Sequence, residues 1–165
     1  MKAVAAVLAA LVAVGVLMYV YTAPADAPAE MTEAEIAQIE AEVLEFAEAH
    51  LSAFGELDAD LLMSFWLEDN ISSVSFVQRM AGTEEMSAFF DGLVASWQQT
   101  NAEWQPGSIV DVISPTMALF QGTSRQEVAF SDGRELVQRV HFTHFLRKTQ
   151  GEWRIQRNHV SGGVW

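Results

Sequence analysis

The chain contains no cysteine, which excludes disulfides, thiolate metal sites and a cysteine nucleophile. It also has no Lys or Arg from Ala3 to Gln78, whereas Asp26 to Asp69 holds 13 acidic residues. With a formal net charge of −13, such a surface repels the phosphates of nucleic acid and the headgroups of anionic lipid. We therefore expect no nucleic-acid partner.

Positive charge is also scarce at the N-terminus, where Lys2 precedes the uncharged and mostly apolar residues 3–21. As a helix at roughly 1.5 Å per residue, this stretch is about 28 Å long, which fits a membrane span. The sequence Ala23-Pro-Ala25 also suits signal cleavage. We interpret residues 1–25 as a signal anchor or a signal peptide, and residues 26–31 as a linker. Either reading exports residues 32–165 as one domain, anchored on the periplasmic or extracellular side, or secreted after cleavage.

The exported domain is predicted to begin with helices and to end with strands. Thr32-Glu-Ala-Glu35 forms a capping box, and apolar residues then recur every three or four positions as far as Gly55. Two shorter helices are predicted at residues 58–66 and from Thr83 onward, with a strand at residues 71–77 between them. Three further strands are expected over residues 103–113, 116–130 and 135–148, with a hairpin turn at Asp132-Gly133.

The last two strands form a hairpin around Gln150-Gly151. A two-residue turn pairs Thr149 with Glu152, and this register sets His144 opposite Arg157 and Phe142 opposite His159. Period-2 alternation then places His144, Arg157 and His159 on the apolar, inward face, beside Phe142 and Trp153. Basic side chains inside a sheet require a partner or a cavity. We predict that these five residues line a ligand site, with a core or surface role as the alternative for each of the three basic residues.

Several motifs resemble those of the nuclear transport factor 2-like superfamily. They are Gly55-Glu-Leu-Asp58, residues 65–70 leading into a strand, and Gly82-Thr-Glu-Glu85 at the start of a helix. The closing Gly-x-Trp-x-Ile-x-x-x-His-x-Ser pattern, residues 151–161, is similar to the SnoaL-like (polyketide-cyclase-like) branch. The resemblance covers about residues 33–163. It implies an α+β fold, in which a curved antiparallel sheet and three N-terminal-side helices form a cone (a cystatin-like α+β barrel), preceded by an N-terminal hydrophobic helix.

The resemblance extends to isomerases, dehydratases, cyclases and non-catalytic ligand binders, so it does not select one activity. The ketosteroid-isomerase branch uses an inward Asp and a Tyr, but Tyr19 and Tyr21 are the only tyrosines here and both lie in the leader. Dehydratase members combine pocket histidines with an Asp. His144 and His159 are therefore the candidate catalytic residues, with Asp69 or Asp111 as a conceivable third member. His50, on the first helix, is expected to serve packing.

Two functions follow from these residues. The first is an exported, non-catalytic binding or assembly domain whose conical pocket accepts a small organic ligand, carboxylate-bearing if Arg157 contacts it. The alternative is a cofactor-free lyase or isomerase that acts through pocket histidines. We expect no metal and no cofactor, because the histidines lack an inward carboxylate beside them. A homodimer, testable by sedimentation, is expected through an outward row consisting of Arg139, His141, Phe145, Gln156 and Val160.

Overall fold

The computed structural model describes residues 30–74 and 79–164. The predicted N-terminal hydrophobic helix lies outside these residues, as does most of the predicted linker. Within the described ranges, no helix combines the length and the apolar character that a membrane span requires.

The first described helix, α2 (Glu33–Glu56), begins at the predicted capping box. Thr32 Oγ1 accepts a hydrogen bond from the Glu35 amide at 3.3 Å, and the Glu35 carboxylate accepts one from the Thr32 amide at 2.8 Å. The helix ends one residue beyond Gly55, and Leu57 takes the left-handed conformation (φ 51°) that closes it. Both ends of this helix are therefore local features of its sequence.

The two shorter helices are α3 (Ala59–Ser64), capped by the Asp58 carboxylate, and α4 (Gly82–Ser96). The first is shorter than predicted because Trp66 already belongs to the following strand. Thr83 does not cap α4. The residue before the helix is Ala81, whose amide donates to the Glu85 carboxylate at 2.7 Å.

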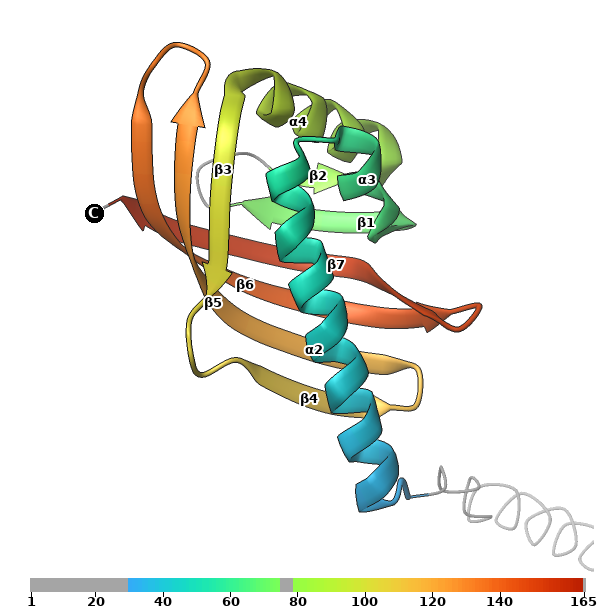
Figure 1. Cartoon of the computed structure of the whole chain (residues 1–165). Helices are drawn as coiled ribbons and strands as arrows, with labels where there is room; N and C mark the ends of the chain where they lie inside the picture. The colour runs from blue at the N-terminus through green and yellow to red at the C-terminus, as the bar shows by residue number, and fades with distance from the viewer. Residues whose placement is uncertain (1–29, 75–78, 165) are drawn as a thin grey trace, which may run out of the picture. The chain divides into compact units, whose positions relative to one another are not determined.

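Seven strands form one curved, unclosed sheet in the order β2-β1-β7-β6-β5-β3, with β4 also paired to β5 (Figure 1). The strands are β1 (Trp66–Val74), β2 (Met80–Ala81), β3 (Trp97–Trp104), β4 (Ile109–Ser114), β5 (Met117–Phe130), β6 (Glu135–Thr149) and β7 (Glu152–Val164). The strand predicted over residues 103–113 spans the end of β3, a break around Gly107 (φ 103°) and most of β4, and β3 begins earlier than predicted, at Trp97. One pair, β1 with β7, is parallel, whereas only antiparallel pairs were predicted.

Both predicted hairpin turns are confirmed. Gly133 has a φ of 86°, and the Asp132 side chain accepts a hydrogen bond from the Arg134 amide. Gln150 and Gly151 have φ values of 54° and 86°, and Thr149 pairs with Glu152 as expected. Positive φ at both central residues is typical of the tight turns that match the twist of a hairpin. The fold class predicted from the sequence, α+β with a curved sheet and helices, is therefore confirmed.

The predicted register of the last hairpin is correct only as far as Ile155. Leu146 pairs with Ile155, but Phe145 pairs with Arg157, so Gln156 is an extra residue in β7. Such a β-bulge exchanges the two faces of the strand beyond it. Arg157 and His159 consequently point outward and are exposed, whereas Asn158 is buried opposite His144. The prediction that Arg157 and His159 face inward is wrong for this reason.

The concave face of the sheet packs against α2, which crosses it, with α3 and α4 at one end (Figure 1). A hydrogen-bonded cluster attaches α2 to the β6–β7 hairpin. The Glu42 carboxylate accepts from Lys148 Nζ at 2.6 Å and from the Trp153 indole N–H at 3.1 Å. These two donors lower the pKa of Glu42, Lys148 having the larger effect. Trp153 is therefore a buried structural residue beside this helix.

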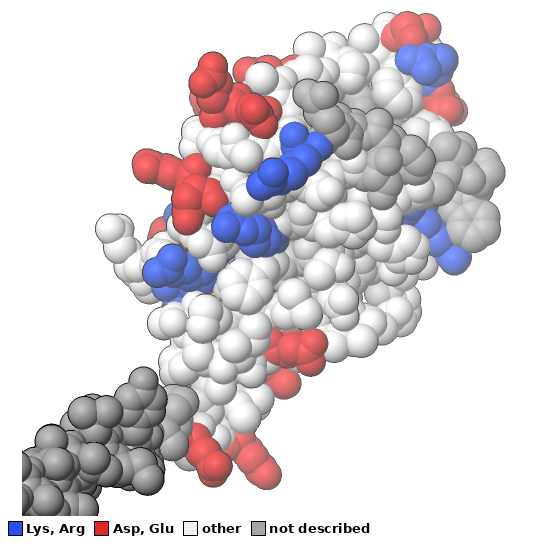
Figure 2. Space-filling model, turned by 180° about the vertical axis from the view of Figure 1, so that it is seen from behind, with Lys and Arg blue, Asp and Glu red and all other residues white. Residues whose placement is uncertain are grey.

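The opposite, outer face of the sheet carries most of the described basic side chains (Figure 2). Arg139, His141 and Phe145 alternate on this face of β6, as the proposed dimer interface requires. Of the other two residues of that predicted row, Val160 departs from it because of the bulge. Gln156 hydrogen-bonds the Asp69 carboxylate at 3.1 Å, and Val160 lines the inner cavity.

Candidate functional site

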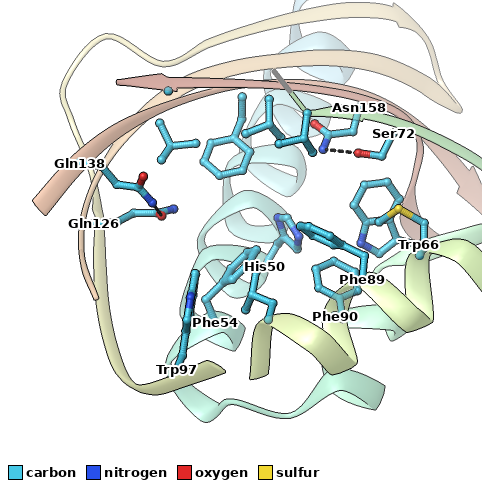
Figure 3. A pocket seen from close by; sticks show the side chains of 17 residues that line it. His50, Phe54, Trp66, Ser72, Phe89, Phe90, Trp97, Gln126, Gln138 and Asn158 are labelled. Carbon is cyan, nitrogen blue, oxygen red and sulfur yellow. Dashed lines mark hydrogen bonds between the residues drawn. The ribbon is translucent and has the colours of Figure 1, made fainter. Parts of the chain in front are cut away.

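A cavity of about 150 Å³ lies between the concave face of the sheet and helices α2 and α4 (Figure 3). Aromatic side chains form much of its wall: His50, Phe54, Trp66, Phe89, Phe90, Trp97 and Phe142. The last turns of α2 contribute His50 and Phe54, because these two residues lie on the helix face that is buried against the sheet. The site is therefore an aromatic, largely apolar chamber inside the fold.

The cavity has polar groups at two opposite sides (Figure 3). On one side, the Asn158 amide donates to the Ser72 hydroxyl at 3.3 Å, and Trp66 lies beside them. On the other side, Gln138 donates to the Gln126 carbonyl at 3.0 Å. None of the described residues that line the cavity is Asp, Glu, Lys or Arg. The described lining of the chamber is thus polar at two places and carries no fixed charge.

Three buried polar atoms of the lining residues have no hydrogen-bond partner within the described part of the chain: His50 Nε2, Trp66 Nε1 and Asn158 Oδ1. Their side chains are at least nine-tenths buried, with exposures of 2%, 8% and 8%. An unsatisfied buried polar group costs about 1–3 kcal/mol, so most such groups in native proteins have a partner. We call these three residues the polar cluster.

His144 lies behind the cavity wall and contacts His50, with the two ring centroids 5.2 Å apart and the rings nearly perpendicular. It also stacks on Phe120 at 5.8 Å, and neither of its ring nitrogens has a partner within the described residues. Burial lowers the pKa of His144 to about 4, and the facing Asn158 amide opposes this shift. Burial, and then the charge of His144, lower the pKa of His50 well below its usual value. Both imidazoles are consequently neutral near pH 7.

The five sequence-predicted ligand residues occupy different environments. Phe142 lines the cavity, and His144 is inward but lies behind the wall. Trp153 is buried beside Glu42, away from the lining residues. Arg157 is outside, where its guanidinium donates to the Asp69 backbone carbonyl at 2.9 Å, and His159 is exposed on the outer face. The structure therefore brings two of the five to the cavity or its wall.

The candidate third members of a catalytic set also lie outside. Asp69 is exposed on β1 and accepts from Gln156, and Asp111 is exposed on β4. Within residues 30–74 and 79–164, no group of three or more metal-ligating side chains could hold a metal ion. The polar groups that the described cavity wall offers to a ligand are therefore imidazole, indole, amide and hydroxyl groups. None of the described lining residues has a carboxylate.

Sequence reasoning missed the polar cluster. His50 was assigned to packing, although it shares the buried helix face with Phe46 and Phe54, which is the face that meets the cavity. The register predicted for the last hairpin implies an outward Asn158, and the helix predicted over residues 58–66 ends at Trp66, which instead begins β1. The helical spacing of His50 was the one signal that could have identified a cavity residue.

The arrangement of helices against a curved sheet is that of a known family. The sequence matches the SnoaL-like domain over residues 43–164, which is most of the described chain. The chain belongs to this family. Comparison with curated proteins gave no match.

Three solved structures illustrate the shared fold of this SnoaL-like domain. A candidate scytalone dehydratase from Novosphingobium aromaticivorans superposes with a TM-score of 0.74 at 12% identity, covering 81% of this chain and 92% of its own. A hexachlorocyclohexane dehydrochlorinase, LinA type 3 from Novosphingobium barchaimii, gives 0.66 at 12%, covering 81% and 90%. A ketosteroid isomerase-like protein from Erwinia carotovora atroseptica gives 0.65 at 18%, covering 74% and 94%. At these identities the likeness establishes the nuclear transport factor 2-like fold alone.

Proposed function

We propose that this SnoaL-like domain binds a small, uncharged ring compound in the cavity behind α2 and α4. The observation that carries the proposal is an aromatic chamber in which three buried polar atoms of the polar cluster have no hydrogen-bond partner among the described residues. A mostly apolar pocket with a few convergent polar groups is the usual form of a small-molecule site. An apolar cavity of about this size in another protein accepts benzene, so a single ring is the appropriate scale.

The charges of the residues around the cavity indicate whether the ligand is charged or neutral. A buried carboxylate needs a cation or several donors, because ionised groups lose several kcal/mol of hydration when they enter a protein interior. Arg157 was the reason to expect a carboxylate-bearing ligand, and its guanidinium lies outside the cavity. The two imidazoles are neutral near pH 7, since burial lowers the pKa of each. A neutral ligand is therefore the better match.

Binding of toluene, phenol and benzoate to the full-length chain tests this proposal. The two uncharged probes should bind at least about tenfold more tightly than benzoate at pH 7, because benzoate would lose its hydration without gaining an ion pair. Isothermal titration calorimetry or ligand-observed NMR measures the three affinities.

Arg157→Met provides the control, because it removes a charge that lies outside the cavity. It should leave all three affinities unchanged. Tight benzoate binding that is weakened by Arg157→Met would show that the ligand is anionic and that Arg157 contacts it.

A second candidate is a cofactor-free lyase or isomerase, favoured by the activities named for the structural neighbours. His159 is outside, so the imidazole that faces the cavity is His50. A neutral imidazole accepts a proton from a bound carbon acid or alcohol and can return it elsewhere on the same molecule. Deuterium incorporation into cyclohexanone in D₂O, followed by NMR, tests this role. Exchange that persists in His50→Gln would remove His50 from the candidate mechanism.

We further propose that residues 32–165 function outside the cytoplasm. The support is the uncharged stretch over residues 3–21 after Lys2, whose length suits a membrane span. Residues 1–30 fused to a reporter that is active only after export should give reporter activity, and activity confined to the cytoplasm would contradict export. The size of the fusion separates an anchor from a cleaved signal, since cleavage after Ala25 shortens it.

A further inference from the structure

We infer that the ligand carries a hydroxyl group on its ring and that this group is held by the polar cluster of His50, Trp66 and Asn158. The inference rests on the proposed function, because it specifies what the same cavity recognises. It makes the ligand a phenol or a cyclic alcohol, and excludes a plain hydrocarbon.

The three orphan atoms differ in what they can bind. The Trp66 indole N–H can only donate, so its partner must be an acceptor. Asn158 Oδ1 is a carbonyl oxygen and can only accept, and the amide nitrogen of the same side chain donates to Ser72. His50 Nε2 donates or accepts according to its tautomer. The cluster therefore demands both an acceptor and a donor from whatever enters the cavity.

These three side chains are neighbours in the wall of one cavity. The ring centroids of His50 and Trp66 are 6.4 Å apart. Asn158 is the cross-strand neighbour of His144, whose ring lies 5.2 Å from that of His50. His50 is thus central to the cluster, with Trp66 and the His144–Asn158 pair as its neighbours. Figure 3 shows the labelled members around the same chamber.

A hydroxyl is the smallest uncharged group that meets both demands, since its one oxygen donates once and accepts twice. A ketone or an ether only accepts, and offers no donor to Asn158 Oδ1. An alkyl ring leaves all three atoms unsatisfied. A protonated amine supplies donors only, and brings a charge into a wall whose described residues carry none. The aromatic side chains around the cavity then hold the ring that carries the hydroxyl.

The size of the effect follows from the number of hydrogen bonds gained. Each bond to a neutral group contributes roughly 0.5–1.5 kcal/mol net, which is about 2- to 12-fold in affinity. We expect phenol to bind at least about fivefold more tightly than toluene, which has nearly the same shape. Anisole, whose oxygen accepts but cannot donate, should bind less tightly than phenol.

Two indoles of the cavity wall provide a matched pair of variants. Trp66→Phe removes an unpartnered buried N–H, whereas Trp97→Phe removes an indole whose nitrogen is not among the unsatisfied atoms. Trp66→Phe should reduce the preference for phenol over toluene by about 2- to 12-fold, with little change in toluene affinity. Trp97→Phe should leave the preference at the value of the unmodified chain.

The affinities of toluene, phenol and anisole for the full-length chain and for the two variants, measured by calorimetry or NMR titration, decide the question. If toluene or anisole binds as tightly as phenol, or if both Trp variants lose the preference equally, hydroxyl recognition by the cluster is wrong. If no probe binds, the proposed function itself fails. The comparison of the three probes on the unmodified chain decides the inference even where a variant does not fold.

Discussion

Lowering the pH from 6.5 to 4 should destabilise the native state by about 3 kcal/mol through His144 alone. Burial lowers the pKa of this imidazole from 6.5 to about 4. In this pH window the unfolded chain therefore binds a proton that the native chain does not. The stabilisation is complete above pH 6.5 and declines until the native imidazole titrates near pH 4. His50, whose pKa is also lowered by burial and by His144, acts in the same direction.

His144→Phe removes the titrating group and retains a ring to stack on Phe120. Urea unfolding at pH 7 and pH 5 should show that the unmodified chain loses about 2 kcal/mol more than this variant between the two conditions. Carboxylates titrate in both proteins, so their effect cancels in the comparison.

His159→Gln is the matched control, since His159 is exposed on the outer face. It should retain the pH dependence of the unmodified chain. Equal losses of stability on acidification in the unmodified chain and in His144→Phe would contradict this prediction. The His144 imidazole would then be solvated or paired, and its position behind the cavity wall would be wrong.

The second large effect is expected from Phe54→Ala, which should lower the free energy of unfolding by about 3–5 kcal/mol. Phe54 is buried at the end of α2, and its ring centroid is 6.3 Å from those of Phe90 and Trp97. Its loss both exposes the neighbouring rings to an empty volume and enlarges the existing cavity. We therefore expect the variant to bind a two-ring compound such as 2-naphthol more tightly than the unmodified chain does.

Phe145→Ala is the control for Phe54→Ala, because Phe145 is half-buried on the outer face of β6. It should cost less stability and leave ligand size preference unchanged. Urea unfolding gives the first quantity, and titration with phenol and 2-naphthol gives the second. Equal stability costs in the two variants, or no gain of 2-naphthol binding in Phe54→Ala, would contradict the assignment of Phe54 to the cavity wall.

Local features of the sequence predicted most of the elements correctly. The Thr32–Glu35 capping box and the positive-φ turns at Gly133 and Gln150-Gly151 depend on residues within a few positions of one another, so they can be read from short stretches. Together with the motifs of the SnoaL-like family, they sufficed for the fold class. The inward position of His144 also followed, because β6 alternates regularly between its two neighbours.

The site itself was decided by tertiary structure. One extra residue at Gln156 exchanges the faces of β7, which moves Arg157 outward and Asn158 inward. The alternation of residues within β7 does not reveal this bulge. The bulge lies where β7 pairs with β6 on one side and with β1, whose register is also irregular, on the other. The contact between His50 and His144 joins a helix to a strand far along the chain. The sequence alone therefore determined that this chain forms a cone with a histidine on its inner face. Only the packing of α2 against the sheet decided which polar atoms meet there, since neither helical nor strand periodicity specifies the register between two elements.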